Sequence, residues 1–327
     1  RLSLVGSEMC IRDRFMAALV FIGGLVFNIG NIAGTGLGVN AMLGLDPKIG
    51  GGISAAIAVL VFLSKRAGVA LDRIVVVLGA IMILLMLYVA IVSQPPVGEA
   101  LKQTVLPERV DFLTITTLIG GTVGGYITFA GVHRLIDSGN SGLENIKQIT
   151  SSSVLGIIVI GIMRVLLFLA VLGVVATGVA LSEDNTAADA FYQAAGEFGL
   201  RAFGLVLFAA GLSSVIGCSY TSVSFVTTQA TSERTRNLLT VSFIVVCAVA
   251  YLLMGAAPQM LLIFAGAFNG IILPIGFAVV MWAAWRRPDL LKGYRYPKSL
   301  LIIGFVVLLG SVVLGVMSLT KLGALWA

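Results

Sequence analysis

The chain has 327 residues, of which 58% are hydrophobic and only 11% are charged, and its mean hydropathy is +1.06. A soluble domain carries about 25% charged residues, so this composition excludes a soluble protein and indicates one that crosses the membrane several times. The net charge of +6 is attributed to basic cytoplasmic loops, and no nucleic-acid partner is expected. Three cysteines and a single histidine exclude a disulfide framework and a multi-histidine metal site.

Residues 1–14 differ in character from the rest of the chain. They are polar, they lack a methionine at position 1, and they form neither a signal peptide nor an amphipathic anchor. We interpret them as a non-native translation of a sequencing adaptor. Residues 15–327 are then a single transmembrane domain, and further helices are expected to precede it.

The sequence predicts an all-α bundle of about nine membrane-spanning helices. An apolar helix of about 20 residues crosses a hydrocarbon layer about 30 Å thick. The apolar spans cover residues 15–42, 50–64, 71–93, 112–136, 152–181, 199–229, 237–256, 259–285 and 299–320. Most connections between them are short, which is typical of one compact bundle without a soluble domain.

Loop charge predicts the orientation of the bundle. Lysine and arginine are concentrated in alternate loops, and such loops face the cytoplasm. The loops assigned to the cytoplasm are 64–72, 134–151, 230–236 and 286–298. The acidic segment 182–198 is expected on the outer side. We therefore expect a multi-pass protein of the cell (plasma) membrane, with the lipid bilayer as its surroundings.

Four glycines interrupt the span 112–136, in the order Gly120-Gly121-Thr122-Val123-Gly124-Gly125-Tyr126. Each glycine costs a helix roughly 1 kcal/mol relative to alanine. One interpretation is a helix broken at 120–126, whose freed ends and carbonyls hold a solute, as in many secondary transporters. The other is that the glycines let a neighbouring helix approach closely.

Two charged positions allow a functional and a structural interpretation. His133 and Asp137 lie at i,i+4 and could relay a proton, or both could be solvated at the cytoplasmic end of the span. Arg164 lies well inside the span 152–181, where an arginine costs at least ~2.5 kcal/mol on insertion scales. It is expected either in a structural ion pair or in transport, although no span carries an obvious partner carboxylate.

Polar residues in other spans fit either helix packing or a polar pathway. Asn28, Asn31 and Thr35 share one face of the first span, and Asn269 precedes Pro274, which is expected to loosen the backbone of its span. Hydroxyls such as Ser213 and Ser214 can coordinate a hard cation or join helices.

Sequence signatures of enzymes are missing from the chain. It contains no Walker A pattern, no nucleotide-binding glycine fingerprint and no nucleophile–histidine–carboxylate set. We therefore expect neither an enzyme nor an ATP-driven pump. No cofactor is expected, apart from a transported divalent cation or sodium.

Four segments together resemble the Nramp family of divalent-metal transporters, which has the LeuT-like inverted-repeat fold. They are Asn28 to Gly36 with Leu43-Gly44-Leu45, Ile119 to Phe129, Ala210 to Ser214 with Gly217 and Tyr220, and Asn269 to Pro274. They resemble the third, the broken sixth, the eighth and the tenth helix of the family. The resemblance covers residues 15–320 and implies that the first two family helices precede this chain.

The chain departs from the family at positions that matter for selectivity. Gly124, Gly125 and Tyr126 stand where the sixth helix has Met-Pro-His, so the soft sulfur ligand for transition metals is missing. Asn28 and Asn31, which do not titrate, stand where the third helix has an Asp and a Glu. These departures put soft-metal selectivity and proton coupling in doubt, and favour a harder cation such as magnesium or manganese.

The resemblance implies a secondary-active transporter that moves a divalent metal cation by alternating access. The expected substrate-binding residues are Gly121, Thr122, Gly124, Gly125, Tyr126 and Asn269. The expected polar pathway comprises Asn28, Asn31, Ser213, Ser214, His133 and Arg164.

Two other classes of function stay open at this point. A carrier of a small organic anion or amino acid would use the backbone N–H groups and half-helix N-termini of a glycine-lined break, which favour carboxylates. A receptor-like membrane protein without transport is the third class. The identity of the solute, the coupling ion and the oligomeric state are not determined by the sequence.

Overall fold

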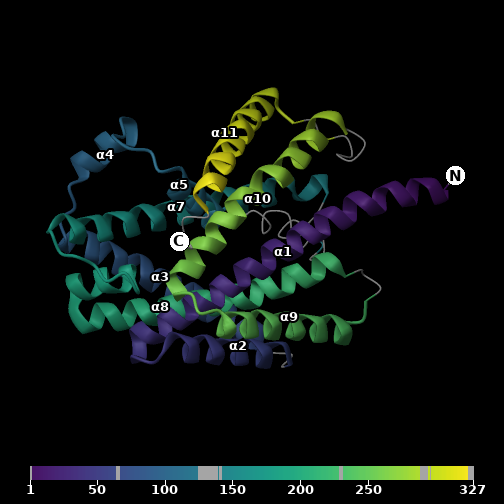
Figure 1. Cartoon of the computed structure of the whole chain (residues 1–327). Coiled ribbons are helices and arrows are strands. Elements are labelled where there is room, and N and C mark those ends of the chain that lie inside the picture. The colour runs from purple at the N-terminus through teal and green to yellow at the C-terminus, as the bar shows by residue number, and fades with distance from the viewer. Residues whose placement is uncertain are drawn as a thin grey trace.

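The computed structural model describes residues 2–63, 67–123, 139, 142–227, 231–287, 294 and 296–322, with the side chains of these residues described from Phe15 onward except at 67–75 and 320–322. Within these residues every regular element is helical (Figure 1). The elements are α1 (Leu2–Leu43), α2 (Pro47–Leu63), α3 (Ala67–Val92), α4 (Val97–Val105), α5 (Phe112–Thr122), the 3-10 turn η1 (Leu143–Asn145), α7 (Ile146–Ala176), α8 (Thr186–Val226), α9 (Glu233–Leu253), α10 (Pro258–Arg286) and α11 (Lys298–Leu322).

The helices confirm an all-α polytopic membrane protein. In the described part of the chain, six helices are long and apolar enough to cross a membrane. The bent pair α3 and α4 raises this number to seven, and α2 and α5 are shorter apolar helices. Together they correspond to the nine predicted spans. Helices α8, α9 and α10 alternate in direction (Figure 1), as short connections between spanning helices require.

Two connections between the predicted spans contain helices of their own. Between α3 and α5, Pro95 and Pro96 end one helix, and α4 begins directly after them at an angle of 106° to α3. Proline is tolerated at a helix start because its missing N–H has no intrahelical partner there. Helix α8 begins at Thr186, because the side chain of Asn185 accepts a hydrogen bond from the N–H of Ala188.

Helix α8 changes direction at Gly196, which has φ 61° and ψ −154°. This backbone conformation is open to glycine but strained for other residues. The residues before it lie at one end of the bundle, and those after it form the predicted span.

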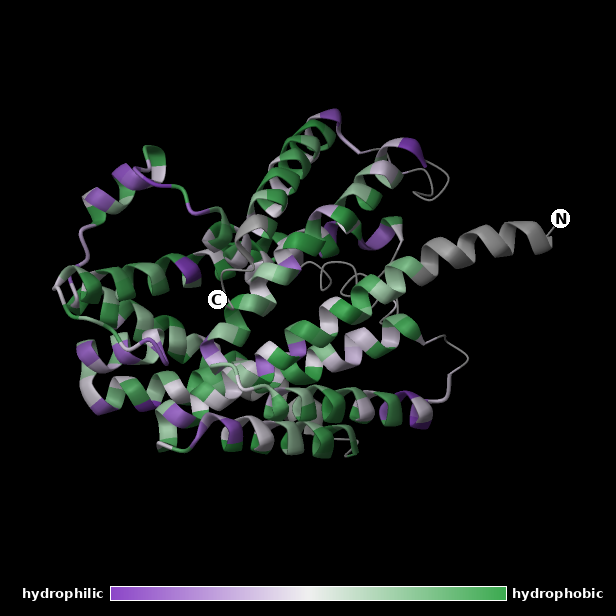
Figure 2. Cartoon of the chain, viewed as in Figure 1, coloured by the Kyte–Doolittle hydropathy of each residue, from purple (hydrophilic) through white to green (hydrophobic). Residues whose placement is uncertain are grey.

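Hydrophobic residues run along most of the helices (Figure 2), and many large apolar side chains are exposed. Only 6% of the most apolar stretch of α7 is buried, and the same fraction holds for α11. An apolar surface of this extent is stable only against lipid or other apolar partners. Charged residues gather at helix ends and connections, for example at Glu233 and Arg234 at the start of α9.

Helix α1 is the central element and packs against α2, α8, α9 and α10. Its crossing with α8 needs two glycines, since a Cβ on Gly38 would collide with the backbone of Phe208 and one on Gly204 with that of Met42. Small residues of this kind let membrane helices approach closely. The core beside this crossing includes the fully buried side chains of Ile32 and Val215.

Candidate functional site

Helix α5 spans Phe112–Thr122, and hydrogen bonds are described at both of its ends. At its start, the carboxylate of Asp111 accepts hydrogen bonds from the N–H groups of Leu113 (3.0 Å) and Thr114 (3.4 Å). At its end, the N–H of Val123 donates to the carbonyl of Ile119 at 2.8 Å. The last helical residue, Thr122, falls inside the predicted break at 120–126. Gly124, Gly125, Tyr126 and His133 lie outside the described residues.

Two adjacent glycines of α5 have different surroundings. A Cβ on Gly120 would collide with the carbonyl of Gly266 and the backbone N of Gly270 on α10, whereas one on Gly121 would meet nothing within 4 Å. The close-packing interpretation of the glycine motif therefore fits Gly120, and the rest of the predicted break, at 124–126, lies outside the described residues. Gly120 lets α10 pack closely, and Gly121 lies beside open space.

That open space is a cavity of about 300 Å³ at the end of α5. Four helices line it. Helix α1 contributes Asn31, α5 contributes Thr117 and Gly121, α7 contributes Arg164, and α10 contributes Gly266. Three of these residues, Asn31, Gly121 and Arg164, were predicted from the sequence as site or pathway residues. Thr117 was not singled out, although it belongs to a run of threonines in an otherwise apolar helix.

The guanidinium of Arg164 reaches the end of α5. Its Nη2 donates a hydrogen bond to the carbonyl oxygen of Gly121 at 3.2 Å. Among the described residues no carboxylate forms an ion pair with Arg164. The carbonyls of a last helical turn carry the negative end of the helix dipole, so this carbonyl is a favourable partner for a cation.

Two other polar groups in the lining of the cavity have no partner. The amide nitrogen Nδ2 of Asn31 and the hydroxyl of Thr117 are buried without a hydrogen-bond partner in the described chain. A buried polar group left unsatisfied costs about 1–3 kcal/mol, and most such groups in proteins are paired. Both atoms are buried in this structure, and both belong to residues that line the cavity.

A second set of unpaired polar atoms lies in the core beside α1. The Nδ2 of Asn28 donates to the Oγ of Ser219 at 3.1 Å, and the Nδ2 of Asn269 donates to the carbonyl of Ala265 at 2.9 Å. Both asparagines are fully buried, and both amide oxygens lack a donor among the residues described. Neither asparagine lines the cavity at the end of α5, so these two acceptor oxygens lie in the helix core outside it.

The polar face predicted for α1 is divided among different neighbours. Asn28 contacts α8 through Ser219, Asn31 lines the cavity, and the hydroxyl of Thr35 is 2.6 Å from that of Ser54 on α2. The central place of α1 explains this division, because the helix has neighbours on all sides. Asn28 and Thr35 therefore join α1 to neighbouring helices, whereas Asn31 lines the cavity.

The hydroxyls of α8 are largely satisfied within the helix. The Oγ of Ser219 donates to the carbonyl of Val215 at 2.6 Å, and the Oγ1 of Thr221 donates to that of Gly217 at 2.8 Å. Serine and threonine commonly bond to the preceding helical turn in this way. Ser213 and Ser214 are half-buried on α8 and do not line the cavity at the end of α5.

Helix α10 passes through Pro274 without a break, from Pro258 to Arg286. Pro274 therefore does not interrupt the helix around Asn269. Proline cannot donate the usual bond to the residue four positions earlier, which is Gly270. The close contact between Gly270 and α5 holds this part of α10 in place.

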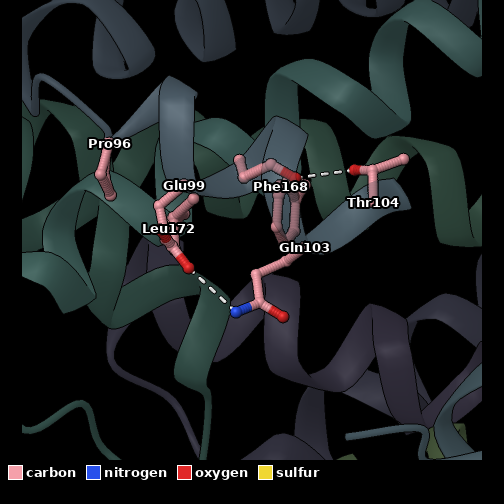
Figure 3. A pocket seen from close by; sticks show the side chains of 7 residues that line it. Pro96, Glu99, Gln103, Thr104, Phe168 and Leu172 are labelled. Carbon is pink, nitrogen blue, oxygen red and sulfur yellow. Dashed lines mark hydrogen bonds between the residues drawn. The ribbon is translucent and has the colours of Figure 1, made fainter. Parts of the chain in front are cut away.

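A second cavity, of about 250 Å³, lies between α4 and α7 (Figure 3). Its polar groups bond to one another, since Nε2 of Gln103 donates to Glu99 at 2.9 Å and Oγ1 of Thr104 donates to the carbonyl of Ala100 at 2.7 Å. Phe168 and Leu172 form its apolar wall. It therefore lacks the unpaired donors found at the end of α5, and we assign the candidate site to the latter.

A polytopic helical bundle with a polar cavity at the end of a short helix has the architecture of a membrane transporter. The chain belongs to the Nramp family, because the family model described as "Natural resistance-associated macrophage protein-like" matches residues 12–321. Membership in this family makes the chain a membrane transporter.

Two relatives align over nearly the whole chain. The "Uncharacterized membrane protein YcsG" of Bacillus subtilis (strain 168) is 46% identical over 315 residues, which cover 96% of this chain and 78% of the relative. An "Uncharacterized membrane protein" of Haemophilus influenzae is 47% identical over 303 residues, which cover 92% of this chain and 76% of the relative. Both names place these relatives in a membrane, in agreement with the apolar surface of the bundle.

Proposed function

We propose that this protein is a secondary-active transporter that moves a divalent metal cation across the cell membrane by alternating access. The observation that carries the proposal is the Nramp family match over residues 12–321. The cargo is proposed to pass near the inner face of α1, where polar atoms without partners are concentrated.

The proposed metal is a hard cation such as magnesium or manganese. Its ligands would be oxygens, and the unpaired amide oxygens of Asn28 and Asn269 are two candidates. In the described part of the chain, no group of three or more His, Cys, Asp or Glu side chains is placed to hold a metal. A cation bound by neutral oxygens is held weakly, which suits a cargo that must be released.

Uptake into proteoliposomes that contain the full-length protein tests this proposal. We expect saturable uptake of Mn²⁺ or Mg²⁺, and the loss of one oxygen ligand in Asn269→Leu should reduce it by roughly tenfold. The control is Asn40→Ala, because the Nδ2 of Asn40 bonds only to the nearby carbonyl of Leu45 at an exposed helix end. If no divalent cation moves through the wild-type protein, the metal assignment is wrong.

A small organic anion is a second candidate cargo, and the cavity at the end of α5 favours it. Arg164 supplies a positive charge there, Asn31 an unpaired N–H donor, and no acidic side chain lines the cavity within the described residues. Binding measured by isothermal titration separates the two candidates. Heat released by small carboxylates, with none from Mn²⁺ or Mg²⁺, would favour the anion.

A further inference from the structure

We propose that Arg164 is a resident cation, whose guanidinium occupies the position at the end of α5 where broken-helix transporters bind a coupling ion such as sodium. In such transporters, the carbonyls at half-helix C-termini coordinate Na⁺ or protons. This inference concerns the coupling ion, so it holds for either cargo considered above. It rests on the proposed function only in treating the end of α5 as part of the transport site.

The first support is the hydrogen bond between Arg164 and Gly121. The Nη2 of Arg164 lies 3.2 Å from the carbonyl oxygen of Gly121, the residue before the last one of α5. Carbonyls in the last turn of a helix carry partial negative charge and favour a cation. The space beside Gly121 is open, so the carbonyl is accessible to an ion, and the arginine takes that place.

The second support is the position of Arg164 in its own helix. It lies in the middle third of α7 (Ile146–Ala176), too far from either end for its head to reach the membrane surface easily. Among the described residues no carboxylate neutralises it. Within the described part of the chain, its polar contact is therefore the carbonyl of Gly121 near the end of α5.

The third support is the permanence of the charge. A guanidinium stays protonated throughout the physiological pH range, and it cannot diffuse away. A sodium ion at the same carbonyl would meet this fixed positive charge at close range in a medium of low dielectric constant, where repulsion is strong. The wild-type site therefore retains its cation through the whole transport cycle and has no need of sodium.

Thermal unfolding of the full-length protein in detergent tests the inference without any transport assay. Tm is measured in NaCl, choline chloride and guanidinium chloride at equal, low millimolar concentrations. For wild type we expect the same Tm in all three salts. For Arg164→Ala we expect a lower Tm in choline, and a rise of at least ~2 °C when Na⁺ or guanidinium fills the vacated place.

Two matched variants complete the experiment. Arg164→Lys keeps a positive charge and should respond to the salts as wild type does. Lys147→Ala removes an exposed charge at the start of α7. This variant should change neither Tm nor its salt response. If Arg164→Ala does not fold in choline, the expected result is recovery of folded protein when guanidinium is present during purification.

The inference is overturned if wild type and Arg164→Ala respond identically to Na⁺ and guanidinium. It is equally overturned if no Arg164 variant folds in any of the salts, since the role of the arginine would then be purely structural. Neither outcome affects the proposed transport function, which is measured by uptake. Conversely, a failure to detect uptake leaves the Tm comparison valid.

Discussion

Thr116 and Thr117 are neighbours on α5, yet among the described residues only the hydroxyl of Thr116 has hydrogen-bond partners. The hydroxyl of Thr116 donates to the carbonyl of Leu314 at 3.3 Å and accepts from the hydroxyl of Ser318 at 2.6 Å, both on α11. The hydroxyl of Thr117 is buried without a partner in the described chain and belongs to a residue that lines the cavity. The hydroxyl of Thr116 joins two helices, and that of Thr117 is left without a hydrogen bond in the described structure.

This contrast predicts that a change to valine affects stability at Thr116 and uptake at Thr117. Thr116→Val should lower the free energy of unfolding by about 1–2 kcal/mol, because it leaves the Ser318 hydroxyl without one partner. Thr117→Val should leave stability unchanged or slightly raised, and should reduce uptake of the cargo. Thermal unfolding and proteoliposome uptake of both variants check this. Equal losses of stability in the two variants would contradict the assignment.

The glycines of α5 give a second matched pair. Gly120→Ala should destabilise the protein by about 1–3 kcal/mol, because the new methyl group collides with the α10 backbone. Gly121→Ala meets open space and should be tolerated or slightly stabilising, since alanine favours a helix. Denaturation midpoints of the two variants in the same detergent provide the measurement. If Gly120→Ala is as stable as wild type, the close packing of α5 on α10 is wrong.

The strength of the hydrogen bond between Asn28 and Ser219 can be measured with a double-mutant cycle. It joins α1 to α8 over 191 positions in the sequence. Such bonds between membrane helices contribute about 0.6 to 2 kcal/mol. We expect Asn28→Ala and Ser219→Ala to destabilise the protein less than additively when they are combined. Strict additivity would mean that the two side chains do not interact.

The orientation predicted from loop charge is testable by cysteine labelling. In a Cys10→Ser background, the remaining Cys218 and Cys247 are buried and should not react. A membrane-impermeant maleimide added to intact cells should label Glu99→Cys on α4 and spare Arg234→Cys at the start of α9. Labelling of Arg234→Cys alone would invert the orientation. Both positions are exposed, so access to the reagent depends only on the side of the membrane.

The sequence alone determined the class of the protein and most of its helices. Apolar runs long enough to cross a membrane can be counted without tertiary contacts, because lipid satisfies their side chains and the helix satisfies their backbone. Two short outer helices, α4 and the first part of α8, were missed because local capping residues, Pro96 and Asn185, start them outside any apolar run.

Only the tertiary structure showed which glycines and threonines of α5 contact neighbouring helices and which do not. The sequence could not distinguish Gly120 from Gly121, or Thr116 from Thr117, because each pair has the same chemistry and adjacent positions. Their roles differ because adjacent residues of a helix point about 100° apart, and the neighbouring helix lies on one side only. The partner of Arg164 was equally inaccessible to sequence reasoning, since a backbone carbonyl 43 positions away leaves no signature in the residue types.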